Sequence, residues 1–546
     1  MASNLPIFSE EDAQQLRLDM YSLKARKDFR HSCIDVHTNR TASLGPSPEE
    51  IPETYIQYYR QPIRQPILAV REDAATLEGW QLHHKAVRMA SWPKPSDGEL
   101  NWYVARKEKD LDRWRSVGIA ETLELCFSLG NGGGNRAPLV AALCFWDTSS
   151  NTFNFKFGQM GITLLDILTI TGLPIHPAAY CFGGLDHTAD TLEFKPSKVR
   201  APFNKSYTAW TNRFSLLETE EGGIAFLELW FCKYIFCNSA HKITGTWTAL
   251  AANLFNRQPI GLGQPVLASL YRALYSLSLR PFDFNNIVGP LWILDLWLQI
   301  YFPQFRHPDV DNFPEDQVLG MAFANRTKFD SPTYIECFKC LYHLDDSALD
   351  SAALILSRKF PSPLECGFLL SATHSRNAAE AFMRAISCYD FGLSEELHGF
   401  ELYAPNHFAR QLGFKQEIPL PLINSLNRYC SWRIKAGAVT IGDEADRYTV
   451  RFKLNYQQLP PPVSCIERSQ RISAAYKVWW SQVSAGYWDR DAEHIFRSIF
   501  ANGITLLGFA EDQRVLKNGP TPEYTGKQSL TKKGKAKAQV YRIFLS

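Results

Sequence analysis

The stretch TSSNTFNFKFGQMGITLLDILTITGLP, residues 148–174, carries the signals of a strand, a turn and a helix in succession. Polar and apolar residues alternate over 151–157, and successive side chains of a strand point to opposite faces. The apolar face carries three aromatic rings, Phe153, Phe155 and Phe157. A turn is predicted at 158–161, which has a glycine at each end. The pattern therefore predicts a β-hairpin whose aromatic face lies in the core.

A short helix is predicted after the hairpin. Thr163 and Asp166 form a capping-box pattern, in which the hydroxyl accepts a backbone N–H and the acid suits the positive helix end. Gly172 ends the helix and Pro174 follows it. A hairpin beside a short helix superficially resembles a DNA-reading element. However, the helix is mostly Leu and Ile and offers few groups to base edges, and the hairpin contributes one cation, Lys156, so we predict a scaffold.

The composition of the 546-residue chain bounds its class. It is 45% hydrophobic and 13% aromatic, enough for a large buried core, and its net charge of +2 gives no global basic field for nucleic acid. The twelve cysteines are scattered and no apolar signal peptide precedes them, so reduced thiols are expected. The most apolar window, 287–302, is too short to span a bilayer, and no membrane association is predicted. Its Asp295 and Gln299 are expected to bond to neighbouring helices.

Helical spacing dominates the rest of the chain. The predicted helices cover residues 10–30, 73–90, 97–117, 120–129, 222–236, 264–277, 289–303, 333–343, 347–357, 377–389 and 424–435, and 466–507 is mostly helical. The predicted fold is mainly α, a large aromatic-rich helical domain with a small β-hairpin and few short strands. We expect an N-terminal helix and Pro-rich connector over 1–72, the main domain over 73–510, and a basic, disordered tail over 511–546.

Three motifs suggest chemistry. The loop GNGGGN, 130–135, resembles a phosphate cradle, but the Lys-Ser or Lys-Thr of a phosphate loop is missing, so a flexible loop is favoured. The acidic loop 307–316 has carboxylates at cation-binding spacing, but its prolines favour a solvated loop. Zinc-like spacing occurs at Cys337, Cys340 and His343, with Cys366 or His374 as a fourth ligand. The same residues also read as an ordinary apolar helix with buried thiols, which is the favoured interpretation.

The tail contains a cluster of lysines without an acid: Lys527, Lys532, Lys533, Lys535 and Lys537. Such a cluster is typical of a nuclear-import signal or of a non-specific phosphate contact. A merely solvated tail is the alternative.

Four blocks in order resemble the plant mobile domain family, also called aminotransferase-like. They are FWDTSSNTFNFKFGQMGITLLDILTITGLP (145–174), AFLELWFCKYIFC (225–237), GQPVLASLYRALYSL with GPLWILDLWLQIYFP (263–303), and ELYAPNHFARQLGFKQEIPLPL (401–422). The resemblance spans about 80–480, and the long C-terminal half looks like the transposon-associated branch.

The resemblance implies a nuclear protein that supports meristem maintenance, genome stability and transposon silencing. It implies protein partners, among them one resembling plant serine/threonine phosphatases, and no established catalytic residue. True transamination needs a lysine for a Schiff base and a large α/β domain, and the chain shows no alternating strand–helix series. We therefore predict a non-enzymatic interaction protein without a cofactor and with at most weak, non-specific nucleic-acid binding. The alternatives are a transposon-encoded or domesticated DNA-associated protein and an uncharacterised enzyme.

Overall fold

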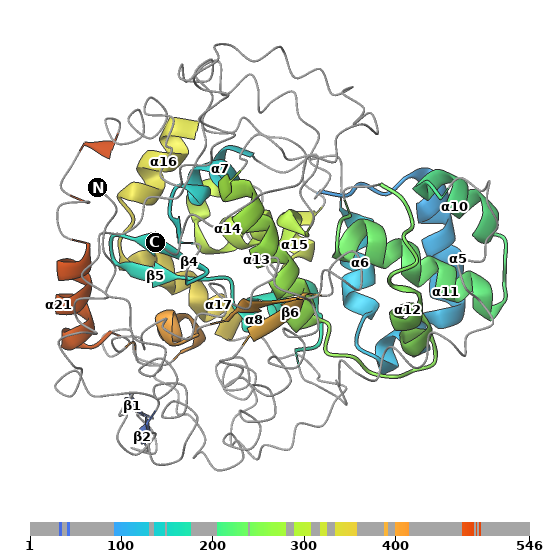
Figure 1. Ribbon diagram of the computed structural model, residues 1–546, viewed down its shortest axis with the longest axis horizontal. Coiled ribbons are helices and arrows are strands. Elements are labelled where there is room, and N and C mark those ends of the chain that lie inside the picture. The colour runs from blue at the N-terminus through green and yellow to red at the C-terminus, as the bar shows by residue number, and fades with distance from the viewer. Residues whose placement is uncertain are drawn as a thin grey trace, which may run out of the picture.

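Helices make up most of the part of the chain that the computed structural model describes (Figure 1). The described residues are 32–34, 41–43, 92–129, 136–147, 150–175, 205–238, 241–279, 289–306, 317–324, 334–356, 387–390, 399–403, 405–413, 416, 472–484, 488 and 491–492. The sheets are small and antiparallel. The prediction of a mainly α fold with a hairpin and few short strands is confirmed.

One group of helices lies at the right of Figure 1. It contains α5 (Asp97–Ser116), α6 (Ala120–Ser128), α10 (Tyr207–Phe214), α11 (Glu220–Trp230) and α12 (Thr248–Phe255). The predicted helices at 97–117 and 120–129 are confirmed by α5 and α6. Ser96 caps α5 through a capping box with Glu99, which explains why the helix begins there.

The second group surrounds the hairpin. Its helices are α7 (Arg136–Leu143), α8 (Leu164–Thr171), α13 (Gly263–Leu279), α14 (Leu291–Tyr301), α15 (Met321–Ala324), α16 (Tyr334–Tyr342), α17 (Ala352–Leu356) and α21 (Ala474–Val483). The 3-10 turns are η5 (Pro303–Phe305), η6 (Asp346–Ser351), η8 (Pro405–His407) and η9 (Ala409–Leu412). Helix α6 contacts both α8 and α15, so the two groups share one hydrophobic core.

The hairpin is confirmed, but its turn was predicted in the wrong place. Strands β3 (Trp146–Asp147), β4 (Thr152–Phe155) and β5 (Gly158–Met160) form a three-stranded sheet. Phe155 pairs with Gly158, so the turn is the two residues between them. Gly158 is instead a strand residue with φ of +129°, and a Cβ there would lie 2.6 Å from Arg410 Nη2 and from Tyr476 Oη. A glycine is therefore needed here because the side chains of Arg410 and Tyr476 come close to the backbone, and not because the chain turns.

The aromatic face of the hairpin lies in the core as predicted. Phe153 and Phe155 are fully buried, and Phe157 is half-buried. Their rings stack in a ladder, with centroids 6.1 Å apart between Phe153 and Phe155 and 5.9 Å apart between Phe155 and Phe157. The ring of Trp297 on α14 extends the ladder at 5.3 Å from Phe153. Such pairs add to the burial of apolar area, which is the main stabilising term.

Tertiary contacts overrode helical spacing in three places. The predicted helix at 347–357 begins as the 3-10 turn η6 and becomes α17 only afterwards. The end of the predicted helix at 377–389 is strand β6 (Ser387–Asp390), which pairs with β7 (Gly399–Leu402) and packs on α13. The helix predicted at 222–236 changes after Trp230 into a π-helical turn, η4 (Phe231–Ile235). The spacing of apolar residues within one segment does not reveal a distant strand partner or an inserted helical residue.

Several expectations concern other parts of the chain. The predicted helices at 10–30, 73–90 and 424–435 lie outside the described residues, whereas α21 confirms a helix within 466–507. Within the region predicted as N-terminal helix and Pro-rich connector, β1 (Ser32–Ile34) pairs with β2 (Thr41–Ser43). In the described ranges, none of the helices has both the length and the apolar character needed to cross a bilayer.

Candidate functional site

The open edge of the hairpin is covered by side chains from far along the chain. Because β5 is the outer strand, its backbone groups on the far side need partners from outside the sheet. Those partners come from η9 and α21, more than 240 residues downstream. We call this set of side chains the edge clamp: Arg410, Gln411, Tyr476 and Trp480. The four residues belong to segments that the sequence analysis treated as separate helices and blocks.

Arg410 is the centre of the edge clamp. Its guanidinium donates through Nη1 to the carbonyl of Phe157 at 3.0 Å and through Nη2 to the carbonyl of Gln159 at 2.7 Å. The group lies over the rings of Phe157 and Tyr476, at 4.9 and 5.5 Å from their centroids. Burial lowers the pKa of Arg410 below its usual value. Two carbonyls and two ring faces thus meet a buried positive charge.

The other members of the edge clamp complete the row of partners. Gln411 pairs with Gly161 as a peptide group would: Gly161 N–H donates to Oε1 at 2.7 Å and Nε2 donates to the Gly161 carbonyl at 3.0 Å. The Gln159 N–H donates to the Tyr476 hydroxyl at 3.1 Å. Trp480 Nε1 reaches the carbonyl of Phe155 at 3.1 Å. Along the outer edge of β5, Arg410, Gln411 and Tyr476 therefore take the place of a fourth strand. Trp480 binds the turn end of the sheet.

A buried polar layer lies on the sheet itself. Gln159 Nε2 donates to Asn154 Oδ1 at 3.2 Å, and Gln159 Oε1 is 2.9 Å from His407 Nδ1. Asn151, which has a left-handed φ of 55°, donates through Nδ2 to Glu401 at 3.1 Å. Polar groups in a low-dielectric interior are stable only when they are hydrogen-bonded to one another, so this layer specifies one register for the hairpin.

Helix α8 is part of the same scaffold. Its predicted capping box is present, with Thr163 N–H donating to Asp166 at 2.7 Å, and Gly172 ends the helix in the left-handed conformation, φ 83°. Asp166 also accepts from the Tyr301 hydroxyl at 2.9 Å, and burial raises its pKa to about 6 against these hydrogen bonds. Every residue of α8 is buried. A buried helix cannot enter a DNA groove, which agrees with the scaffold prediction.

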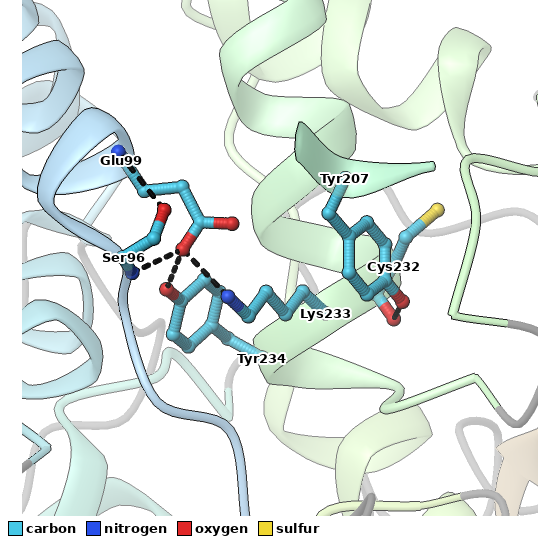
Figure 2. Close-up of polar contacts among 6 residues, drawn as sticks. All are labelled: Ser96, Glu99, Tyr207, Cys232, Lys233 and Tyr234. Atoms are coloured by element: carbon cyan, nitrogen blue, oxygen red, sulfur yellow. Dashed lines mark hydrogen bonds and ion pairs between the residues drawn. The ribbon is translucent and has the colours of Figure 1, made fainter. Parts of the chain in front are cut away.

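A second polar constellation lies at the π-helical turn η4 (Figure 2). Figure 2 shows one oxygen of Glu99 accepting from three groups. They are the Ser96 N–H at 2.8 Å, Lys233 Nζ at 2.5 Å and the Tyr234 hydroxyl at 3.2 Å. Both members of the ion pair are buried, with side chains 2% and 14% exposed. Burial lowers the pKa of Lys233, and the Glu99 carboxylate opposes that effect.

The backbone around η4 is unusual. Phe236 N–H donates to the Phe231 carbonyl at 2.9 Å, the wider ring of a π-helix. Cys237 follows in the left-handed region with φ of 45°, a conformation that costs a non-glycine residue about 1 kcal/mol or more. The Tyr207 hydroxyl donates to the Cys232 carbonyl at 3.0 Å (Figure 2). The extra residue changes the register of the side chains after Trp230, and the ion pair with α5 holds that register.

We expect Lys233→Met to destabilise the protein by roughly 1–3 kcal/mol, since the variant leaves a buried carboxylate without its cation while the Ser96 and Tyr234 donors remain. The double variant Glu99→Gln/Lys233→Met should recover part of the loss. Urea unfolding of both variants and of the exposed-pair control Lys109→Met measures the effect. If Lys233→Met and Lys109→Met had equal free energies of unfolding, the buried pair would contribute nothing specific to stability.

Glu228 on α11 predicts a pH dependence of stability. The buried carboxyl accepts from the Thr248 hydroxyl at 2.7 Å, and burial raises its pKa from 4.5 to about 8. The folded protein therefore holds a proton that the unfolded chain releases between these values, so this group makes stability fall as pH rises from about 4.5 to 8. We expect Glu228→Gln to raise the melting temperature more at pH 8 than at pH 5. An equal change at both pH values would contradict the assignment.

The predicted zinc ligands differ in their exposure to solvent. On α16 and directly after it, Cys337 is buried, Cys340 is half-buried and His343 is exposed. Burial raises the pKa of Cys337, and raises that of Cys340 to about 11, which disfavours the thiolate that binds metal. In the described part of the chain, no group of three His, Cys, Asp or Glu side chains is placed to hold a metal ion. Cys366 and His374 lie outside that part, so the zinc alternative, which the sequence analysis ranked below a helix with buried thiols, stays untested.

The other predicted sites have mixed outcomes. Asp295 and Gln299 pair with each other on α14, where Gln299 Nε2 donates to Asp295 at 3.0 Å; this contact does not test the predicted bonds to neighbouring helices. Residues four apart are neighbours on a helix, which explains the pairing. The loops at 130–135 and 307–316 lie outside the described residues, as do the tail lysines Lys527, Lys532, Lys533, Lys535 and Lys537.

Sequence reasoning missed the edge clamp and the Glu99–Lys233 pair. One signal was present: the block at 401–413 places His407, Arg410 and Gln411 among aromatic and apolar residues. Long polar side chains in such a context are buried only when they find partners. The block alone does not reveal that the partners are the hairpin backbone.

The hairpin, its clamp and helices of both groups lie within the part of the chain that matches a known family. Residues 134–481 match the family described as Plant mobile domain. Over 261 residues the chain is 26% identical to Protein MAIN-LIKE 2 of Arabidopsis thaliana, an alignment that covers 42% of this chain and 38% of the relative. The chain thus matches well under half of the length of that relative. No solved structure matches.

A helical domain built around a clamped hairpin defines the class of protein, and the family match covers more than half of the chain. The chain belongs to the plant mobile domain family. The match lies inside the predicted 73–510 domain, whose limits stay predictions. Neither the family description nor the name of the relative denotes a catalytic activity.

Proposed function

We propose that this chain is a non-enzymatic nuclear interaction protein of the plant mobile domain class. It takes part in meristem maintenance, genome stability and transposon silencing, and it acts with a partner resembling serine/threonine phosphatases. Family membership supports the class. The nuclear role and the partner rest on what the family resemblance implies, and the lysine cluster of the tail supports nuclear import.

The edge clamp is the observation that carries the non-enzymatic part of the proposal. The stretch 145–174, which resembles the family, contains many polar groups. The described ones form hydrogen bonds that hold the hairpin and α8 in place. Arg410, Gln411 and Tyr476 occupy backbone groups of this stretch that a substrate could otherwise bind. A motif used in this way supports a rigid platform rather than a reacting centre.

Buried nucleophiles support the same proposal. Burial raises the pKa of Cys126 and Cys232 to about 12 and raises that of Cys144 further. A thiol of this kind stays protonated at neutral pH and is a poor nucleophile. The amine of Lys233 is bound to Glu99 in the interior, where it supports the fold rather than a Schiff base.

Affinity purification from isolated plant nuclei tests the proposal. We expect the tagged full-length chain to recover protein partners, including a serine/threonine phosphatase-like protein, and the five-lysine variant Lys→Gln at 527, 532, 533, 535 and 537 to lose nuclear accumulation. A matched control replaces exposed cations of α5, Lys109 and Arg115, by glutamine and should remain nuclear. Cytosolic wild-type protein, or nuclear protein without partners, would contradict the proposal.

A further inference from the structure

Two arginines on the inner face of α5 share a single carboxylate. Arg106, Asp110 and Arg113 stand four and three residues apart and so lie on one face of the helix. Arg106 Nη2 contacts Asp110 Oδ2, and Arg113 Nη1 donates to Asp110 Oδ1 at 2.9 Å. The side chains of Arg106 and Asp110 are 5% and 6% exposed. Two guanidinium groups face one carboxylate, so this largely buried cluster carries a net charge of about +1.

Part of the donor capacity of these arginines is unused. Among the described residues no acceptor meets Arg106 Nε, Arg106 Nη1 or Arg113 Nε, although all three atoms are buried. An unsatisfied buried donor is unfavourable, and more so when it carries charge. The carboxylate of Glu218 does not supply the missing acceptor, since it is exposed and bound to Lys109 at 2.9 Å. Besides Asp110, the described part of the cluster thus holds no second anion, and three of its N–H groups have no acceptor.

The surroundings hold the guanidinium groups in fixed positions. Arg113 Cζ lies 3.7 Å from the centroid of the Phe255 ring at the end of α12, and Arg106 Cζ lies 6.0 Å from it. A Cβ at Gly223 on α11 would lie 2.5 Å from Arg106 Nη2 and 2.1 Å from the Phe255 ring, so the glycine makes room for both groups. A guanidinium that stacks on a ring keeps its N–H groups in one plane, ready for two-point contact with an oxyanion.

We propose that Arg106 and Arg113 form an oxyanion-binding site between α5, α11 and α12, which takes the phosphate or carboxylate group of a partner or ligand. The side chain of Arg113 is 26% exposed and gives the anion access from solvent. The bound oxyanion neutralises the excess charge and accepts from the unused N–H groups. This site is separate from the edge clamp and does not depend on the proposed nuclear role.

Isothermal titration calorimetry of the full-length protein with inorganic phosphate tests the site, with sodium chloride at equal ionic strength as the reference. We expect saturable phosphate binding in the wild type and an affinity at least about tenfold weaker in Arg113→Gln, as the loss of one charge-assisted hydrogen bond implies. Arg115→Gln is the matched control, because Arg115 lies on the same helix, is 64% exposed and leaves the cluster untouched. Its affinity should equal that of the wild type.

Two further arms sharpen the result. Arg113→Lys keeps the charge but loses the planar donors, and its affinity should fall as well, because a fork rather than a point charge binds the anion. Acetate in place of phosphate identifies the ligand chemistry: saturable acetate binding indicates a carboxylate, and phosphate binding alone indicates a phosphate group. The proposal is overturned if neither anion binds saturably, or if Arg113→Gln and Arg115→Gln bind equally well.

Discussion

Phe155→Asp is expected to yield protein that is insoluble or unfolded at 25 °C. Phe155 is fully buried, and its ring lies between those of Phe153 and Phe157 and against the edge of Phe302. Loss of a buried Phe side chain alone costs about 3–5 kcal/mol, and an unpaired carboxylate in the same place adds several more. The sum is comparable to the whole stability of an ordinary domain, about 5–15 kcal/mol.

The neighbouring residue provides the control for this prediction. Lys156 lies in the turn and is exposed, so Lys156→Asp introduces the same carboxylate one position away without burying it. We expect this variant to be soluble, with a melting temperature close to that of the wild type. Soluble expression and thermal unfolding of both variants check the prediction. A folded Phe155→Asp protein with unchanged melting temperature would show that the strand face does not lie in the core.

Arg410→Met should destabilise the protein by roughly 3–6 kcal/mol and make it prone to aggregation. The variant removes two charge-assisted hydrogen bonds, each worth about 1.5–3 kcal/mol, and leaves the buried Gln159 carbonyl and the part-buried Phe157 carbonyl without that donor. Replacing a buried charge by an apolar residue can be neutral when its partners are replaced too, but here the partners are backbone and stay. The uncovered edge of β5 then becomes available to another strand.

Urea unfolding and light scattering of the full-length variants measure these effects. Arg410→Lys keeps the charge but cannot bridge two carbonyls, so its stability should fall between those of wild type and Arg410→Met. Arg213→Met is a control for removal of an exposed arginine from a helix and should change stability by less than about 0.5 kcal/mol. Equal stability of Arg410→Met and wild type would show that the edge clamp does not hold the hairpin.

The edge clamp explains two blocks of the family signature together. Gly158 and Gly161 leave room for Arg410, Tyr476 and Phe408, since a Cβ at either glycine would lie 2.6 Å from one of their side-chain atoms. Each block therefore constrains the other although about 250 residues separate them. A substitution in one block should be tolerated only when the other block changes with it.

The residues near one another in sequence determined the local elements. The capping box of Thr163 and Asp166 and the left-handed Gly172 were readable because each interaction joins residues at most four positions apart. The alternation of Phe153, Phe155 and Phe157 determined which face of the strand packs into the aromatic core, since side chains alternate in any strand. That the opposite face is buried as well, in a polar layer, was not readable from it. The excess of apolar helices over strands likewise determined the fold class.

Tertiary structure alone decided the rest. The glycines at 158 and 161 look like turn residues in sequence, and only the approach of Arg410 and Phe408 shows why they are there. Strand β6 pairs with β7, and Lys233 in the π-helical turn pairs with Glu99 on α5, 134 residues earlier in the chain. In each case the contacting residue lies beyond the short segment whose pattern of apolar residues predicts a helix or a strand. Chain entropy separates such partners in the unfolded state, and only the closed core brings them together.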